Sequence, residues 1–269
     1  MIHPTAIVAD GAKLAEDVSV GAYSIVDSEV SIGAETSIGP HTVITGPTQI
    51  GCNNRIFQFC SIGELPQDRQ CRNPTPENSS GRLIIGDNNT IREYCTINRG
   101  TIEGGGQTTI ADDNFFMAYV HIAHDCKIAS HTIFANAASL AGHVEVGDYA
   151  TLSGFVMVHQ FCRIGQYAYS GMGSGLNKDL PPYLLAAGLP AQTHGLNKVG
   201  LRRAGFSEDV IEKLHHAYLK LLHPLSGYKI NVGEQYKVAE QYLEVKHLIE
   251  FIETSMDSKH RGILPSEKG

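Results

Sequence analysis

The chain has 269 residues, of which 42% are apolar and 18% are charged, and its formal net charge is −7. This composition is typical of a folded globular protein and excludes a disordered chain, while the acidic balance argues against nucleic acid as the main partner. Because there is no apolar run of transmembrane length, no secretory leader and no CxxC pair among the six cysteines, we expect a cytoplasmic protein with free thiols and no transmembrane segment.

Aliphatic residues recur every six positions along the first two thirds of the chain. The series runs over residues 2–62, returns over 85–97, and runs again over 110–176. A period of six fits neither the 3.6-residue period of a helix nor the simple alternation of a strand. It fits a short strand followed by a corner, so that three such sides close a triangular coil and stacked coils bury one aliphatic column.

The hexapeptide repeat resembles that of the left-handed parallel β-helix family. The handedness comes from this resemblance alone, because parallel crossovers are otherwise right-handed. We therefore predict a mainly β protein, with a left-handed parallel β-helix of hexapeptide repeats over residues 1–185. The two interruptions, 64–83 and 98–109, are predicted to be loops that leave the coil, and long loops in compact domains are commonly functional. The first contains RNPTPENSSG, which predicts a mobile tip.

Beyond about residue 180 the repeat gives way to a proline-containing exit, LPPYLLAAGLPAQ, and then to helical periodicity. Ser207, followed by two acidic residues, has the features of a helix N-cap. Apolar residues at helical spacing follow over 210–222, and a second amphipathic stretch covers about 234–255. We predict a C-terminal α-helical domain over residues 186–269, which covers the open strand edges of the coil.

Histidines gather on one side of the predicted prism. Repeat units that begin at Ile122, Leu140 and Val158 are spaced so that they stack on one face, about 4.8 Å apart. The polar side chains in or next to these units are His121, His124, His143, His159 and Gln160. We expect them to lie within about 10 Å of one another along this side.

Three interpretations of this cluster are open: surface histidines without a function, a zinc site, or a general base. Imidazole is a common zinc ligand, but no second group of cysteines or carboxylates converges on this face. Nothing in the sequence matches a nucleophile elbow. The residues favour a histidine general base that acts on an acceptor hydroxyl or amine, and we predict no metal and no cofactor.

Longer segments resemble the acyl-ACP:UDP-N-acetylglucosamine O-acyltransferase family of lipid A biosynthesis. These segments are HIAHDC, IREYCTINRGTIEGGGQT, LAGHVEVGD, VHQFCRIG, the DLPPY exit and NKVGLRRAGFS. The resemblance covers nearly the whole chain, including the helical tail. It implies a homotrimer with active sites between neighbouring prisms. It also implies transfer of an (R)-3-hydroxyacyl chain from acyl carrier protein to the 3-hydroxyl of UDP-N-acetylglucosamine, the first step of lipid A biosynthesis, without a covalent enzyme intermediate.

The resemblance also implies roles for individual residues. The catalytic set is His124 as general base, Asp125 as its support, and the backbone N–H of Gly142 as oxyanion donor. Because neighbouring strand residues point to opposite faces, support of His124 by Asp125 requires a bend in the chain. The predicted substrate-binding residues are Asp68, His121, His143, His159, Gln160, Asn197 and Arg203.

Met172, in the segment SGMGSG, matches the family position that limits the acyl groove. In the family, glycine at this position goes with long chains and methionine with shorter ones. A methionine side chain fills several methylenes' worth of groove, so we predict a medium-length acyl donor with Met172 as its ruler. Ordinary packing between prisms is the alternative role for this residue.

Four positions depart from the family pattern, all of them where the acceptor is expected to bind. Gln70 stands where lysine is usual, Asn98 where histidine is common, Val199 where glutamate is usual, and Ala204 where arginine is usual. They leave open a paralogous acyl-ACP-dependent acyltransferase that acts on a different nucleotide sugar or amino-sugar. A third interpretation is a trimeric scaffold without catalytic activity.

Overall fold

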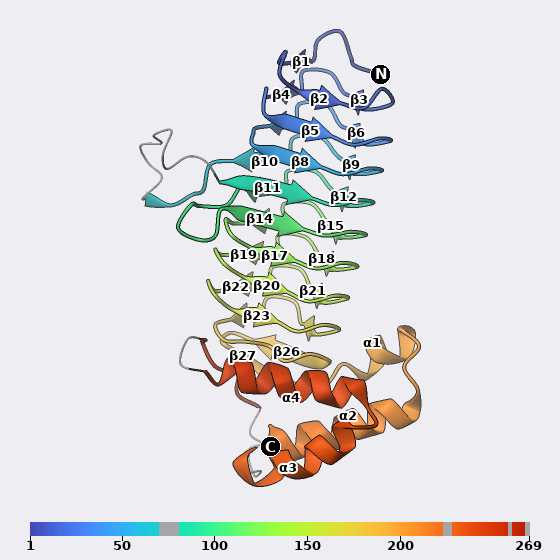
Figure 1. The fold of residues 1–269 in the computed structure, drawn as a ribbon, viewed down its shortest axis with the longest axis vertical. Helices are drawn as coiled ribbons and strands as arrows, with labels where there is room; N and C mark the ends of the chain where they lie inside the picture. Colours follow the sequence, from blue (N-terminus) through green and yellow to red (C-terminus); the bar gives the residue numbers. More distant parts are fainter. Residues whose placement is uncertain (70–80, 223–227, 258–259, 267–269) are drawn as a thin grey trace.

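The molecule is a long prism of stacked coils with helices at one end (Figure 1). It was obtained as a computed structural model, which describes residues 1–69, 81–222, 228–257 and 260–266. The N-terminus lies at one end of the prism, and the helices lie at the other (Figure 1). The fold is a left-handed parallel β-helix followed by helices, so the predicted fold class is confirmed.

The described residues form three sheets, one on each side of the prism, and up to β25 the strands that neighbour one another in a sheet are three apart in the chain. The β1 sheet consists of β1 (Ile7–Val8), β4 (Ile25–Val26), β7 (Val43–Ile44), β10 (Ser61–Glu64), β13 (Thr96–Asn98), β16 (His121–Ile122), β19 (Ser139–Leu140), β22 (Met157–Val158) and β25 (Gly175–Leu176). The β2 sheet consists of β2 (Lys13–Leu14), β5 (Val30–Ile32), β8 (Thr48–Ile50), β11 (Arg82–Ile85), β14 (Gln107–Ile110), β17 (Lys127–Ile128), β20 (Glu145–Val146) and β23 (Arg163–Ile164). The β3 sheet consists of β3 (Ser19–Val20), β6 (Ser37–Ile38), β9 (Arg55–Ile56), β12 (Thr90–Ile91), β15 (Phe115–Phe116), β18 (Ile133–Phe134), β21 (Thr151–Leu152), β24 (Tyr169–Ser170), β26 (Leu184–Gly188) and β27 (Ala191–Leu196).

The six-residue repeat sets the register of every coil on the next. Ile122 pairs with Leu140, and Leu140 pairs with Val158. All three side chains are buried, while the residue before each of them points outward. Burial of one branched or aromatic side chain per strand therefore fills the prism axis and forms one continuous core.

The corners between strands contain residues in the left-handed backbone region. Examples are Tyr23, Asp125 and His143, with φ of 59°, 61° and 62°. This conformation costs a non-glycine residue roughly 1–2 kcal/mol. At one row of corners the cost is offset by ring stacking, because Tyr23, His41, Phe59, Tyr94 and Tyr119 form a continuous column. Each stacked aromatic pair is worth about 0.5–1.5 kcal/mol beyond its buried area.

Two excursions leave the coil on the same side of the prism (Figure 1). The first leaves after Glu64, at the end of β10, and returns at Arg82, where β11 begins. The mobile tip that we predict for it lies outside the described residues. The second leaves after Asn98 and returns at Gln107, three residues before the return predicted at Ile110, because β14 pairs with β11 from its first residue. The excursion is therefore shorter than predicted.

The coil ends in a hairpin, and the helices follow it. β26 pairs with β24 in parallel and with β27 antiparallel, which ends the regular stacking. In the described part of the chain the helices are α1 (Lys198–Arg203), α2 (Glu208–Leu221), α3 (Tyr228–Ala239) and α4 (Leu243–Ser255). Ser207 caps α2, since its Oγ accepts a hydrogen bond of 3.3 Å from the backbone N–H of Val210. The boundary between residues 1–185 and 186–269 stays a prediction.

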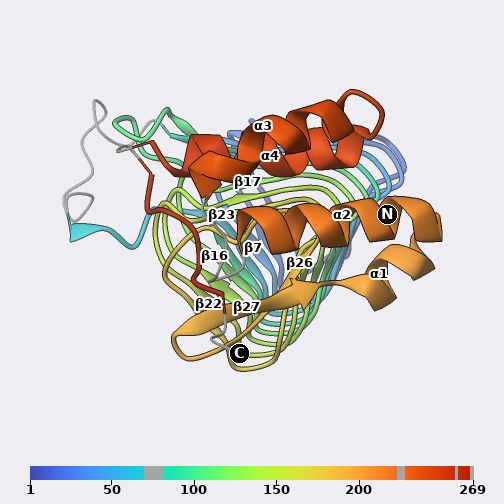
Figure 2. The ribbon, with the colours of Figure 1, turned by 90° about the horizontal axis from the view of Figure 1, so that it is seen from below.

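The single amphipathic stretch expected over 234–255 is divided between two helices. α3 ends at Ala239 and α4 begins at Leu243, with Tyr242 in an extended conformation between them. The Tyr242 hydroxyl donates a hydrogen bond of 2.7 Å to Asp209 of α2, which ties the break to the neighbouring helix. Tertiary contact thus overrides the continuous helical pattern, and α4 turns to lie against the β2 sheet (Figure 2). Among the described residues, no helix is long and apolar enough to cross a membrane.

The inward and outward positions of one strand offer a direct test of the core. We expect Leu152→Ala to destabilise the protein by about 2–5 kcal/mol, because Leu152 is fully buried and alanine leaves a cavity. Thr151→Ala, one residue earlier on the outward face, should change stability by less than about 1 kcal/mol. Urea unfolding of both variants makes the comparison. Equal losses would contradict the assigned strand orientation.

Candidate functional site

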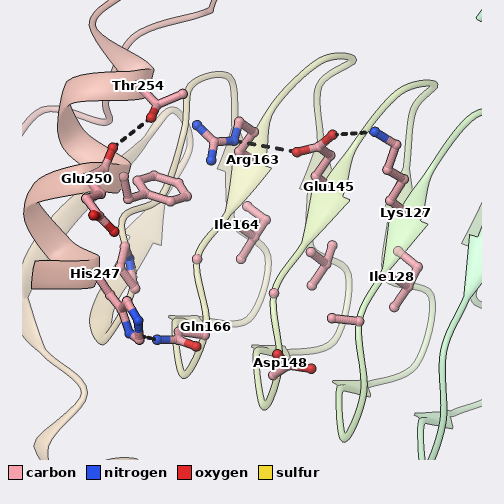
Figure 3. Close-up of a pocket in the computed structure, with 16 residues that line it drawn as sticks. Lys127, Ile128, Glu145, Asp148, Arg163, Ile164, Gln166, His247, Glu250 and Thr254 are labelled. Carbon is pink, nitrogen blue, oxygen red and sulfur yellow. Dashed lines mark hydrogen bonds and ion pairs between the residues drawn. The ribbon is translucent and has the colours of Figure 1, made fainter. Parts of the chain in front are cut away.

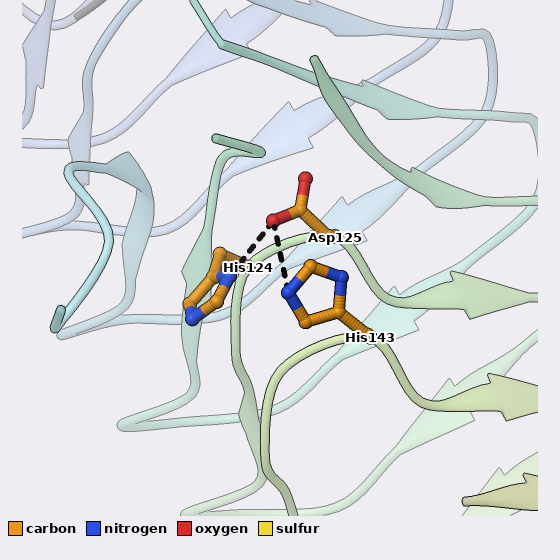
Figure 4. Close-up of side chains that lie close together, drawn as sticks. All are labelled: His124, Asp125 and His143. Atoms are coloured by element: carbon orange, nitrogen blue, oxygen red, sulfur yellow. Dashed lines mark hydrogen bonds and ion pairs between the residues drawn. The ribbon is translucent and has the colours of Figure 1, made fainter. Parts of the chain in front are cut away.

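The histidine-rich site lies at one edge of the prism, between the β1 and β2 sheets. The corner after β16 carries His124 and Asp125, and the corresponding corner of the next coil, after β19, carries Gly142 and His143. Figure 4 shows His124, Asp125 and His143 converging at this edge. Because Asp125 has a φ of 61°, the chain turns between these neighbours, and their side chains lie on the same side. The bend that the pairing of His124 with Asp125 requires is therefore present.

A hydrogen bond joins the two side chains of this corner. His124 Nδ1 lies 2.8 Å from Oδ2 of Asp125. The side chain of His124 is 16% exposed, whereas that of Asp125 is fully buried. Thr101 contributes two further hydrogen bonds, from its backbone N–H to Oδ1 at 2.9 Å and from its hydroxyl to Oδ2 at 2.7 Å.

These contacts fix the charge of Asp125 and the tautomer of His124. Burial by itself would raise the pKa of Asp125, but the hydrogen bonds from His124 and Thr101 outweigh it and hold this pKa below its ordinary value. An ionised carboxylate only accepts hydrogen bonds. Nδ1 of His124 therefore carries the proton, and Nε2 presents its lone pair as a proton acceptor.

Gly142 leaves room for the imidazole of His124. A Cβ atom at position 142 would lie 2.6 Å from Cε1 and 2.8 Å from Nε2 of that ring, which is closer than real side chains approach. The Gly142 carbonyl accepts a hydrogen bond from the Phe161 amide. Within the described ranges the Gly142 amide donates to no protein group. It is therefore an available donor beside Nε2.

His143 completes the cluster from the next coil. Its Nε2 lies 3.7 Å from Oδ2 of Asp125, and its ring stacks on Phe161 with ring centroids 4.4 Å apart. Burial lowers the pKa of His143, although the charges of Asp125 and Asp68 act in the opposite direction. Asp68, a predicted substrate-binding residue, is thus near enough to act on His143 electrostatically.

The other predicted binding residues of this edge lie farther from Asp125. His121, on β16, has its Nδ1 2.7 Å from the Thr96 hydroxyl, and burial together with the His124 charge lowers its pKa. His159 and Gln160 follow β22, one coil beyond Gly142, and Nδ1 of His159 lies 3.1 Å from the Gln160 carbonyl. These three residues line the same edge without touching the carboxylate.

Three predicted residues lie at other edges of this chain. Asn197 caps α1 by accepting a hydrogen bond from Gly200, and its Nδ2 donates to the carbonyl of Tyr167, at the corner between β23 and β24. Arg203 ends the same helix. Met172 lies at the corner between β24 and β25, where 78% of its surface is exposed. The structure of one chain therefore does not bring these residues to His124.

The positions that depart from the family pattern also lie in different parts of the molecule. Asn98 is buried, and its side-chain amide donates to the carbonyls of Glu64 and Leu65 at 3.3 and 2.8 Å. It thereby joins the bases of the two excursions. Val199 is exposed on α1, and Ala204 caps the end of that helix. Gln70 lies outside the described residues.

The cluster also meets the distance requirement of a metal site. The ligand atoms of His124, Asp125 and His143 lie within 4.8 Å of one another. However, the Asp125 carboxylate already accepts three hydrogen bonds, and an ion on Oδ2 would have to displace the donors from His124 and Thr101. These hydrogen bonds favour the general base over a metal ligand set. That no metal binds here remains a prediction.

Two cavities lie beside the cluster, on the β2 sheet. The larger, of about 550 Å³, lies between this sheet and α4 (Figure 3). A row of charges follows it, with Lys127 2.9 Å and Arg163 3.6 Å from the two carboxylate oxygens of Glu145. A smaller cavity of about 200 Å³ shares these three side chains and reaches Asp125 and His143. Neither is lined by His124, so both lie to one side of its reactive nitrogen.

This chain is similar to acyltransferases of UDP-N-acetylglucosamine. Residues 179–264 match the family model described as UDP N-acetylglucosamine O-acyltransferase, domain 2. The acyl-[acyl-carrier-protein]–UDP-N-acetylglucosamine O-acyltransferase of Halorhodospira halophila is 47% identical over 266 residues, which cover 98% of each chain. The protein of the same name from Neisseria gonorrhoeae is 54% identical over 83% of this chain and 84% of its own. The crystal structure of a UDP-N-acetylglucosamine acyltransferase from Francisella novicida superimposes with a TM-score of 0.92 at 37% identity, covering 100% of this chain and 95% of that one.

The tautomer of His124 provides a test of the site geometry. We expect Asp125→Asn to move the ring proton from Nδ1 to Nε2, because the asparagine amide can donate to Nδ1 where the carboxylate can only accept. ¹⁵N NMR of the histidine ring nitrogens measures this change. The ring of His131, whose Nδ1 lies 3.9 Å from Asp113 at another corner, is the internal control and should not change. Retention of the Nδ1–H form in the variant would contradict the assignment.

Proposed function

Because the chain belongs to the acyl-[acyl-carrier-protein]–UDP-N-acetylglucosamine O-acyltransferase family, we propose that His124 is the general base of this acyl transfer. The chain is an acyltransferase that takes its acyl group from acyl carrier protein and passes it to UDP-N-acetylglucosamine, in the first step of lipid A biosynthesis. The observation that supports His124 is its 2.8 Å hydrogen bond to buried Asp125, which leaves Nε2 as a proton acceptor at the edge of the prism.

The reaction follows from the groups around Nε2. Nε2 of His124 accepts the proton of the sugar 3-hydroxyl as its oxygen attacks the thioester carbon of an (R)-3-hydroxyacyl chain. The Gly142 amide donates to the oxyanion of the tetrahedral intermediate. The intermediate collapses by breaking the carbon–sulfur bond, and the imidazolium returns the proton to the carrier-protein thiolate. The ester bond forms and the thioester bond breaks, without an enzyme-bound intermediate.

The separation of the predicted binding residues supports a homotrimer. His124, Asn197 and Met172 lie at three different edges of one chain, so an active site that uses all three needs a neighbouring copy. The outward face of the β1 sheet also exposes apolar side chains, including Ile7, Ile25 and Met157, which suits an interface between copies. We place the active sites between neighbouring prisms, where Asn197 and Arg203 approach the nucleotide. The cytoplasmic location remains a prediction from the sequence.

His124→Ala tests the general base. We expect kcat to fall about 10²–10⁴-fold, because the hydroxyl loses its proton acceptor. The assay incubates the protein with 3-hydroxyacyl carrier protein and UDP-N-acetylglucosamine and measures the 3-O-acyl product by mass spectrometry. His131→Ala, also at a corner and near an aspartate, is the matched control and should remain active. Light scattering should give the mass of three chains for each variant. An active His124→Ala would exclude the base, and a monomer would exclude the trimer.

Met172→Gly tests the acyl-chain ruler. The Met172 side chain is 78% exposed in the single chain and, in the proposed trimer, shortens the groove for the acyl chain. We expect wild type to prefer a medium-length 3-hydroxyacyl donor and the variant to shift its preference to chains longer by several methylenes. Competition between carrier proteins of different acyl length measures the preference, with Met256→Gly in the helical tail as control. An unchanged preference would leave Met172 with a packing role only.

A further inference from the structure

The carboxylate that supports His124 is itself held by a residue from outside the coil. Thr101 belongs to the excursion between β13 and β14, and it is the source of two of the three hydrogen bonds to Asp125. Its backbone N–H holds Oδ1, and its hydroxyl holds Oδ2, the oxygen that faces His124. The excursion therefore reaches the carboxylate through both the backbone and the side chain of Thr101.

Thr101 is fixed in turn by the loop around it. Its hydroxyl accepts a hydrogen bond of 2.9 Å from the Gly104 amide, so the O–H points to Asp125. The Thr101 carbonyl accepts a hydrogen bond of 2.7 Å from the Gly106 amide, which closes the loop between these two residues. The loop joins β11 at Arg82, whose amide donates a hydrogen bond of 2.9 Å to the Gly106 carbonyl and whose carbonyl accepts one of 3.1 Å from the Gly100 amide.

The loop also closes over the carboxylate. A Cβ atom at Gly104 would collide with Oδ2 of Asp125 and would lie 2.6 Å from Cε1 of His143. Backbone thus covers Asp125 where a side chain could not fit, which keeps water from the carboxylate. The backbone amide of Asp125 donates a hydrogen bond of 2.8 Å to the hydroxyl of Thr108 on β14, which holds the backbone of this corner in place.

We propose that Thr101 is a positioning residue of the acyl transfer: its hydroxyl holds Oδ2 of Asp125 on Nδ1 of His124 and so keeps Nε2 in the proton-accepting state. This inference rests on the proposed role of His124 as general base. The terminal torsion of an aspartate has a broad energy profile, so a single contact to His124 does not fix the carboxylate plane. Hydrogen bonds to both oxygens from one rigid residue do fix it.

The Thr101 hydroxyl also helps to keep the Asp125 carboxylate ionised. Asp125 is faced by His124 from its own corner, by His143 from the next coil and by Thr101 from the excursion, while Lys127 and Glu145 line the cavity beside it. The hydrogen bonds from His124 and Thr101 lower the pKa of Asp125 against the effect of burial. Loss of the Thr101 hydroxyl therefore raises this pKa, and the carboxylate becomes protonated at a higher pH.

Thr101→Val removes the hydroxyl at nearly constant shape and keeps the backbone N–H. We expect kcat to fall by about tenfold or more, since a charge-assisted hydrogen bond is lost. KM for both substrates should stay unchanged, because Thr101 contacts neither. The acid limb of the kcat–pH profile should move to higher pH. Thr101→Ser, which restores the hydroxyl, should recover both kcat and the acid limb. Thr109→Val is the matched control on β14, since among the described residues its hydroxyl takes part in no hydrogen bond.

The outcomes separate this inference from the proposed function. If His124→Ala is inactive while Thr101→Val keeps wild-type kcat and acid limb, Thr101 is not a positioning residue and the general base stands. If His124→Ala is active, the proposed function itself fails. If Thr101→Val does not fold, Thr101→Ala is measured by the same profile, and ¹⁵N NMR of folded protein reports the Nδ1–H signal of His124. An unchanged signal and profile in the folded variant would overturn the inference, and loss of both with rescue by serine would support it.

Discussion

In-register stacking of parallel coils is the constraint on which the whole molecule depends. Each coil must place one inward side chain on each of its three sides, so any residue is held about 4.8 Å from its equivalents in the next coils. The pairing of Ile122, Leu140 and Val158 shows this order in the core. The same order brings Gly142 against His124 at the surface. The geometry of the proposed site is thus a consequence of how the core packs.

The corners between strands determine which neighbouring side chains can interact. A straight strand would point His124 and Asp125 to opposite faces. The left-handed backbone conformation of Asp125 turns the two side chains to the same side, where they form a hydrogen-bonded pair. The strained backbone is stabilised locally by the hydrogen bond from the Asp125 amide to Thr108. Core, corner and excursion therefore each contribute one restraint to the same imidazole ring.

The parts of the fold that obey the repeat could be predicted from the sequence, and the parts that leave it could not. The periodicity predicts the strands, the stacking of His124 near Gly142, and the excursions. It says nothing about Thr101, because a residue on an excursion has no register and its partner is defined only by the folded loop. The segment IREYCTINRGTIEGGGQT contained the signal, a threonine followed by a glycine run that lets backbone approach Asp125. The break between α3 and α4 was also missed, because it depends on the contact of Tyr242 with Asp209. Asn197 and Met172 lie at other edges of the chain than His124, and for this reason the proposed active site needs a neighbouring copy.

The two ends of the prism differ in a way that bears on how the molecule comes apart. The described helices lie at the C-terminal end of the prism (Figure 1), whereas the inward residues of the first coil are poorly covered, with Val8 and Leu14 only partly buried and Ile2 49% exposed. In a solenoid, each coil is stabilised mainly by its neighbours. Because the first coil buries less of its inward surface, we expect local opening on heating to be easier there than in the middle of the prism. β16 is the sixth strand of its sheet from that end, so local melting of the first coils leaves the imidazole and its carboxylate in place. The strands of the β1 sheet that precede β16 thus separate the first coil from His124 and Asp125.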